Sequence, residues 1–300
     1  MSQSATKIAI QGWPGANHDI AARAYFGDEP LELVPCLSFP ELFERMNQDE
    51  EMLGMVAIEN TLVGSLLANY TLLKDSGFMV LGEHKLRIKH QLMALPGQTL
   101  ADIKEVHSHP MALAQCEAFF KSYPHIRLVE SEDTALSAKR ISENRTPGVA
   151  AIASSLAAQI YGLELLARDI ETNKHNYTRF LVVGRADEQQ KQKLLSEGRL
   201  TKASLVFSLP HEEGSLSKIL TILTFYNINL SKIQSLPIIG QEWEYLFYID
   251  VQITDYQRYH QSLDAIRPLT RKLRELGEYE AADTLYETNG GGGVKRAVAL

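Results

Sequence analysis

Short runs of aliphatic and β-branched residues alternate with longer amphipathic segments between residues 7 and 184. This alternation is typical of βαβ construction, in which helices connect the strands of a sheet. It predicts strands at 8–11, 31–35, 55–58, 106, 127–129, 149–152 and 180–184, and helices at 17–26, 38–48, 64–74, 110–121, 134–143 and 156–161.

Two extended segments, 78–87 and 88–95, separate the first group of these elements from the second. We therefore expect two consecutive α/β lobes within residues 1–184. Two lobes joined by extended segments form a cleft at their junction, which is the usual place for a small ligand.

A polar stretch, RADEQQKQKLLSEGRLTK, occupies residues 185–202 and predicts a linker or an exposed helix at a domain boundary. Beyond it we expect strands and helices in the order of a ferredoxin-like βαββαβ sandwich, over residues 203–288. The expected elements are 203–209, 215–226, 229–236, 244–252, 255–276 and 283–286. Residues 289–300 contain four consecutive glycines and are expected to be a disordered tail.

The composition narrows the class of partner. The chain has 300 residues, is 45% hydrophobic and carries a formal net charge of −7, which is a normal globular balance. The negative charge argues against a nucleic-acid partner, whose phosphates require a concentrated basic face. A small anionic ligand stays open, because a few local cations can bind it inside an acidic protein.

The two cysteines, Cys36 and Cys116, lie far apart and outside any CxxC or Cys/His ligand spacing. We expect buried free thiols and no metal site. The N-terminus lacks the apolar core of a signal peptide, and no apolar run is long enough to span a bilayer. The sequence therefore predicts a soluble cytoplasmic protein without a membrane partner.

Two expected strand ends carry small residues that suit anion binding. Gly12, Pro14 and Gly15 precede a helix whose first backbone amides favour an anion, although an ordinary tight turn explains them equally well. The segment lacks GxGxxG spacing, so no nicotinamide cofactor is implied. Ser108 precedes Pro110 at the start of another helix and presents a similar terminus.

Polar residues also flank two further strands. Glu59 and Asn60 follow the strand at 55–58, where α/β folds place functional groups, with helix capping as the alternative role. Thr178 and Arg179 stand directly before the apolar run 180–183. A turn-capping threonine and an exposed charge are the alternative for that pair.

Taken together, the motifs resemble the prephenate dehydratase family over residues 7–184. They are GWPGANHDIAA, AIENTLVGS, HSHPMALAQC, AAIASSLAAQIYGLELL and NYTRFLVVG, in that order. The resemblance implies a two-lobed fold like that of a periplasmic binding protein, and the C-terminal segment resembles an ACT domain. It also implies a cofactor-free lyase that converts prephenate to phenylpyruvate, water and carbon dioxide.

The resemblance assigns roles to individual residues. Thr178 is expected to protonate the departing hydroxyl group, Arg179 to pair with a substrate carboxylate, and Phe180 to exclude water. Neutral donors around the substrate oxygens are expected from Asn60, Thr61, Ser65 and Ser108, and Asn17 replaces a hydroxyl residue common in the family. An ionised Glu59 would repel the dianionic substrate, so it must be protonated, tied to a cation or turned away, and we favour an outward or structural role.

Regulation by phenylalanine is less clearly encoded. The family motifs GALV and ESRP are replaced here by GSLS at 214–217 and QSLP at 234–237. The expected regulatory contacts are Gly214, Ser215, Leu216, Ser235 and Pro237, but the charged partners of ESRP are lost. The alternative is that the ACT segment serves only to assemble the oligomer. In either case the resemblance implies self-association through ACT domains into a dimer or tetramer.

Two other functions stay open at this point. An arogenate dehydratase would share these motifs, and two α/β lobes with an ACT domain could also form a non-catalytic sensor of amino acids or anions.

Overall fold

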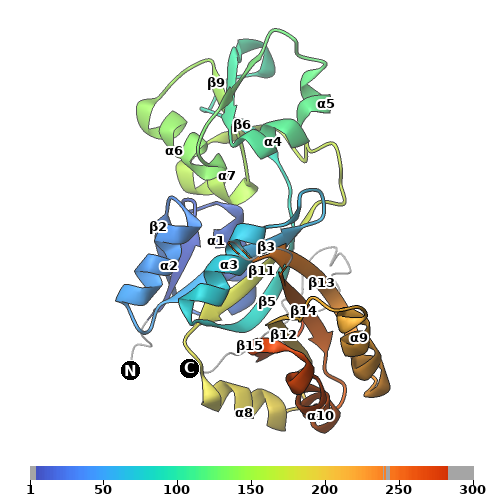
Figure 1. The fold of residues 1–300 in the computed structure, drawn as a ribbon. Helices are drawn as coiled ribbons and strands as arrows, with labels where there is room; N and C mark the ends of the chain where they lie inside the picture. The colour runs from blue at the N-terminus through green and yellow to red at the C-terminus, as the bar shows by residue number, and fades with distance from the viewer. Residues whose placement is uncertain (1–4, 239, 241–243, 283–300) are drawn as a thin grey trace. The chain divides into compact units, whose positions relative to one another are not determined.

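The computed structural model describes residues 5–238, 240 and 244–282 (Figure 1). Its contacts divide these residues into two compact units. The first unit contains residues 5–69 and 84–181, and the second contains residues 70–83 and 182–282. Within the described residues, the structure contains no helix with the length and apolar character needed to cross a membrane.

The first lobe is built on a sheet with the strand order β2-β1-β3-β11-β5, and the short β4 pairs with β3. Strand β1 lies parallel to both β2 and β3, and Ile8 and Ile10 of β1 are completely buried. The elements are β1 (Thr6–Gln11), α1 (Asn17–Phe26), β2 (Leu31–Cys36), α2 (Phe39–Gln48), β3 (Leu53–Asn60), β4 (Gly64–Ser65), α3 (Leu67–Ser76), β5 (Met79–Arg87) and β11 (Tyr177–Gly184).

The second lobe has its own sheet, with the order β10-β6-β9-β7-β8. Strand β7 is parallel to β8 and β9, whereas β6 is antiparallel to β9 and β10. The elements are β6 (Gln91–Ala94), η1 (Leu100–Asp102), β7 (Glu105–Ser108), α4 (Pro110–Gln115), α5 (Glu117–Phe120), β8 (Arg127–Glu130), α6 (Thr134–Asn144), β9 (Val149–Ala153), α7 (Ser155–Tyr161) and β10 (Glu164–Ala167).

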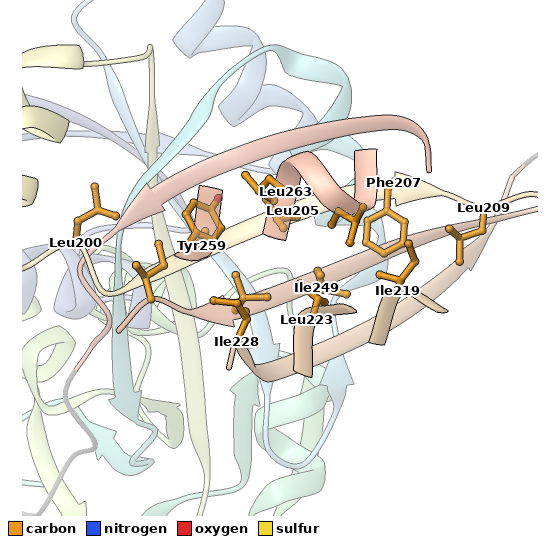
Figure 2. Close-up of a cluster of buried hydrophobic side chains, with 14 of the residues drawn as sticks. Leu200, Leu205, Phe207, Leu209, Ile219, Leu223, Ile228, Ile249, Tyr259 and Leu263 are labelled. Carbon is orange, nitrogen blue, oxygen red and sulfur yellow. The ribbon is translucent and has the colours of Figure 1, made fainter. Parts of the chain in front are cut away.

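The C-terminal sandwich follows helix α8 (Glu188–Ser196) and has an antiparallel sheet in the order β13-β14-β12-β15. Its elements are β12 (Lys202–Ser208), α9 (Ser215–Phe225), β13 (Asn229–Pro237), β14 (Tyr245–Gln252), α10 (Tyr256–Ile266), η2 (Arg267–Leu269) and β15 (Arg271–Tyr279). Figure 2 shows its core, in which Leu205, Phe207 and Ile249 of the sheet pack with Ile219 of α9 and Leu263 of α10. The expected α/β class and βαββαβ order are confirmed.

Two sequence predictions need correction, and one strand was missed. The helix expected at 110–121 is interrupted at Cys116, which separates α4 from α5. The helix expected at 255–276 ends at Ile266, and the segment from Arg271 forms the last strand of the sheet instead. Strand β10 was not predicted at all. The strand expected at 283–286 and the tail at 289–300 lie outside the described residues.

Candidate functional site

A hydrogen bond joins the end of β3 to the start of β11, within the motif NYTRFLVVG at residues 176–184. Asn60 Nδ2 donates to the hydroxyl oxygen of Thr178 at 2.9 Å and to Asn176 Oδ1 at 2.8 Å. All three side chains are at least nine-tenths buried. Because β3 and β11 are neighbours in the sheet, residues 116 and 118 positions apart in the chain meet at one point.

The orientation of the Asn60 amide fixes the direction of this bond. Asn60 Oδ1 accepts from the backbone N–H groups of Leu62 at 2.9 Å and Val63 at 3.1 Å. Its other end must therefore be the NH₂ group, which can only donate. Thr178 is the acceptor, so its own hydroxyl hydrogen is not used by Asn60. A threonine held in this way has its proton available for another oxygen.

The network continues to the second lobe through Gln115 at the end of α4. Asn176 Nδ2 donates to Gln115 Oε1 at 2.9 Å, and His90 Nε2 lies 2.8 Å from the same oxygen. Burial lowers the pKa of His90 from its ordinary value. The neutral imidazole must carry its hydrogen on Nε2, since Gln115 Oε1 can only accept. Every donor in the chain from His90 to Thr178 thus has a defined direction.

A cavity of about 370 Å³ opens beside Gln115 within the first unit. Its lining includes Leu62, Met111, Gln115, Glu117 and Lys121. With Oε1 occupied, the Nε2 group of Gln115 has no hydrogen-bond partner among the described residues. The cavity therefore offers an amide donor, an ammonium group, a carboxylate and apolar side chains to a small ligand.

Arg179 follows Thr178 on strand β11 and does not share a face with it. Successive side chains of a strand point to opposite faces, and Arg179 Nη1 lies 3.9 Å from Glu59 Oε2. The arginine side chain is 9% exposed and that of Glu59 is 40% exposed. Of the three states expected for Glu59, the structure has the one in which it is tied to a cation.

Phe180 is buried on the same face as Thr178. Its ring meets the imidazole of His18 edge to face, with centroids 4.9 Å apart, and His18 also contacts Phe39. Burial lowers the pKa of His18 to about 3, so the ring is neutral near pH 7. Phe180 is thus a core residue beneath Thr178.

The turn before α1 is filled by a side chain of the protein itself. Gly15 donates its backbone N–H to Asp19 Oδ2 at 2.8 Å, and Asp19 is fully buried. Gly15 has φ +89°, and a Cβ there would lie 2.7 Å from the Cα of Ala157, so only glycine fits. The backbone amide of Gly15, expected to face a ligand, thus binds a carboxylate of the chain.

Other expected contacts have structural partners. The Thr61 hydroxyl donates to the His175 carbonyl and accepts from the Tyr177 N–H, so it braces the approach to β11. The Ser108 hydroxyl, which was expected to face the substrate, donates its one hydrogen to the Ile152 carbonyl at 2.7 Å and is fully buried. Ser65 pairs with Glu59 in the β3–β4 ladder. Asn17 is half-buried at the start of α1.

A match to a protein-family model establishes the family of this chain. The model for prephenate dehydratase matches residues 8–188. The chain belongs to the prephenate dehydratase family. This match spans both lobes and includes the His90, Gln115, Asn176, Asn60 and Thr178 network.

Individual members of this and related groups are similar over most of the chain. Arogenate dehydratase/prephenate dehydratase 2 of Arabidopsis thaliana, a chloroplastic protein, is 35% identical over 94% of this chain and 74% of its own length. The structure of prephenate dehydratase from Arthrobacter aurescens in complex with L-Phe is 29% identical, with a TM-score of 0.79, over 93% of this chain and 91% of the other. A structure described as GqqA, a novel type of quorum quenching acylase, is 30% identical with a TM-score of 0.82, over 92% of this chain and 98% of the other.

The residues expected to bind a regulatory ligand gather at one end of the C-terminal sheet. Gly214 is the N-cap of α9 with φ 75°, and Ser215 and Leu216 begin that helix. The ladder pairs Ser208 with Leu246 and Leu246 with Leu236. Ser235 and Pro237 on β13 are therefore at the sheet end where β12 leads toward Gly214.

Sequence reasoning missed Gln115, Asn176 and His90. Gln115 and Asn176 lie within two of the five motifs, and the spacing of Asn176 could have identified it. Asn176 lies two positions before Thr178, so both side chains share one face of the extended segment. His90 gave no local signal, because its contact with Gln115 crosses two elements.

Proposed function

We propose that this chain is a prephenate dehydratase, a carbon–oxygen lyase that converts prephenate to phenylpyruvate, water and carbon dioxide. The observation that carries the proposal is the direction of the Asn60–Thr178 hydrogen bond, which leaves the threonine proton free. Membership in the prephenate dehydratase family supports the same reaction.

Thr178 is the proposed general acid. The ring C–O bond of prephenate breaks as the hydroxyl group receives a proton and leaves as water. The electron pair of the ring-to-carboxylate bond moves into the ring, which becomes aromatic, and carbon dioxide departs. One proton is consumed and is restored to Thr178 from solvent. A hydroxyl donor is a weak acid, so its effect depends on fixed orientation in a dry site.

The cavity beside Gln115 is the proposed place for part of the substrate. Gln115 Nε2 and the Lys121 ammonium suit the carboxylate oxygens, and Leu62 and Met111 suit the ring. Asn60 and Thr61 hold Thr178 and the preceding segment in place rather than touching the substrate. Arg179 is proposed to act through its pair with Glu59.

Arogenate is the alternative substrate, because a similar protein of Arabidopsis thaliana is named for both activities. The test is to incubate the purified chain with prephenate and, separately, with arogenate, and to quantify phenylpyruvate and phenylalanine. Faster release of phenylpyruvate supports the proposal. Preference for arogenate would assign the alternative, and binding of prephenate without turnover would assign a sensor.

Acyl hydrolysis, the activity in the description of one structural neighbour, has no support in this site. An alcohol nucleophile needs a base to take its proton. Among the described residues, the hydrogen-bond partner of the Thr178 hydroxyl is an amide NH₂ group, which cannot accept a proton.

We further propose that residues 1–184 are the catalytic domain and residues 203–288 an ACT domain that associates with a second copy and binds phenylalanine. The L-Phe complex of a similar protein supports this role. Adding phenylalanine during the prephenate assay, with light scattering to follow assembly, tests it. A flat response to millimolar phenylalanine would leave the ACT domain with assembly alone.

A further inference from the structure

A second cavity, of about 570 Å³, lies entirely within the second unit. It is bordered by the C-terminal end of α3 and by strands β12, β14 and β15. A volume of this size is in the range of pockets that enclose small organic ligands. The dehydratase site of the first unit contributes no residue to it.

The charges around this cavity are unlike those of the whole chain. Its lining has four cationic side chains and two carboxylates, a net charge of +2 in a chain whose formal net charge is −7. The cations are Lys74, Arg271, Lys272 and Arg274, and the carboxylates are Asp75 and Glu244. A local excess of positive charge in a concave, partly apolar site attracts anions.

Several of these cations have unused donors. Arg274 Nη1 donates to the Lys74 carbonyl at 2.6 Å, and Arg271 Nη1 donates to Glu244 Oε1 at 3.2 Å. The other N–H groups of both guanidinium groups have no partner among the described residues, nor does the Lys272 ammonium. Lys272 has φ 53°, a left-handed conformation that is uncommon for lysine and often marks a functional position.

Apart from Ser208, the remaining lining residues are apolar. Val206, Ile238 and Leu246 line the cavity beside the cations. Cations next to aliphatic side chains match a molecule that is charged at one end and apolar at the other. We propose that this cavity binds a small organic anion with a carboxylate group and an apolar body.

This cavity differs from the expected phenylalanine pocket. Ser235 is opposite Phe247 in the β13–β14 ladder, and Phe247 packs against the core beneath α9 and α10. Leu246, the adjacent residue, points to the other face of the sheet and lines the cavity. The proposal is therefore independent of both the dehydratase activity and the phenylalanine response.

Calorimetric titration of the full chain with 3-phenylpropionate tests the proposal. This probe has a carboxylate and a phenyl group but no amino group. The unmodified chain should bind it, and Lys272→Gln should weaken binding about fivefold through loss of one exposed charge. Arg271→Gln should weaken it similarly. The matched control Lys193→Gln, an exposed lysine of α8 outside the cavity, should bind as the unmodified chain does.

Two further titrations locate the binding. Gln115→Glu, which places a negative charge in the cavity of the first unit, should bind 3-phenylpropionate as the unmodified chain does, since the second cavity is distinct from the dehydratase site. Acetate, which lacks an apolar body, should bind at least about tenfold more weakly. The proposal is overturned by no binding at millimolar probe, by equal affinity in Lys272→Gln, by loss of binding in Gln115→Glu, or by equally tight binding of acetate.

Discussion

The amide nitrogen of Asn60 lies 2.9 Å from the hydroxyl oxygen of Thr178 and is the donor of the hydrogen bond between them. The backbone N–H groups of Leu62 and Val63 hold the opposite end of the amide, so this direction cannot reverse without breaking both contacts. The short turn after β3 therefore fixes Thr178 on β11 as the acceptor of this bond, so its hydroxyl hydrogen can be donated to another oxygen.

Replacing Asn60 with aspartate tests that direction. A carboxylate only accepts, so Thr178 would donate to it and lose the proton available for the substrate. We expect Asn60→Asp to lower kcat by about 10²–10⁴, the usual contribution of general-acid catalysis. Steady-state kinetics with prephenate measure this, and Asn229→Asp on exposed β13 is the matched control. Equal kcat in Asn60→Asp would show that the direction of the bond is irrelevant.

Replacing Gln115 with glutamate tests the cavity of the first unit. The carboxylate keeps an acceptor for Asn176 and His90 but replaces the amide donor with a negative charge. Repulsion of a dianionic substrate should raise KM by about tenfold. Gln192→Glu, an exposed position of α8, controls for the added charge. An unchanged KM would place the substrate elsewhere.

Replacing Arg179 with lysine distinguishes two roles. If the guanidinium acts with Glu59, Arg179→Lys should lower Tm. In addition, Glu59→Gln should lower Tm less in the Arg179→Lys variant than in the unmodified chain, because the pair is already disrupted there. Thermal unfolding of the two single variants and the double variant gives this coupling. A raised KM for prephenate at constant Tm would instead restore the substrate-carboxylate role expected from the sequence.

The position of Arg179 on β11 shows which spatial relationships the motif encodes and which it does not. The family resemblance selected Thr178, Arg179 and Phe180 as neighbours in sequence, but the alternation of a strand separates the second from the other two. The alternation follows directly from the strand predicted at this apolar run. Asn60 and Gln115 were harder to predict as partners, since they belong to segments distant in the sequence.

The last strand shows a different limit. Leu273 and Leu276 are three positions apart, a spacing that suits a helix as well as a sheet edge. Pro268 interrupts the helix that precedes them, and pairing with β12 then decides the conformation. Long-range pairing of this kind leaves little trace in local sequence.

The buried imidazole of His18 predicts an acid-sensitive fold. Its pKa is lowered to about 3 by burial, whereas in the unfolded chain it is near 6.5. Above pH 6.5 both states are neutral and the group adds no pH dependence. Below it the unfolded chain binds a proton that the folded chain refuses until about pH 3. The free energy of unfolding should therefore fall by ~1.4 kcal/mol per pH unit over this window.

Replacing His18 with leucine should remove that slope. Urea unfolding gives the free energy of unfolding at pH 6.5 and at pH 5. Its decrease between these two pH values should be about 2 kcal/mol smaller in His18→Leu than in the unmodified chain. His211→Gln, at an exposed histidine, should retain the full decrease. Identical decreases in His18→Leu and the unmodified chain would mean that His18 accepts a proton without unfolding.

Turnover of prephenate by Thr178→Val tests the central claim most directly. Valine keeps the shape of the side chain and removes only the hydroxyl group, so kcat should fall by about 10²–10⁴ while KM changes little. Thr178→Ser should retain most of the activity. A Thr178→Val enzyme that releases phenylpyruvate at the unmodified rate would contradict the account.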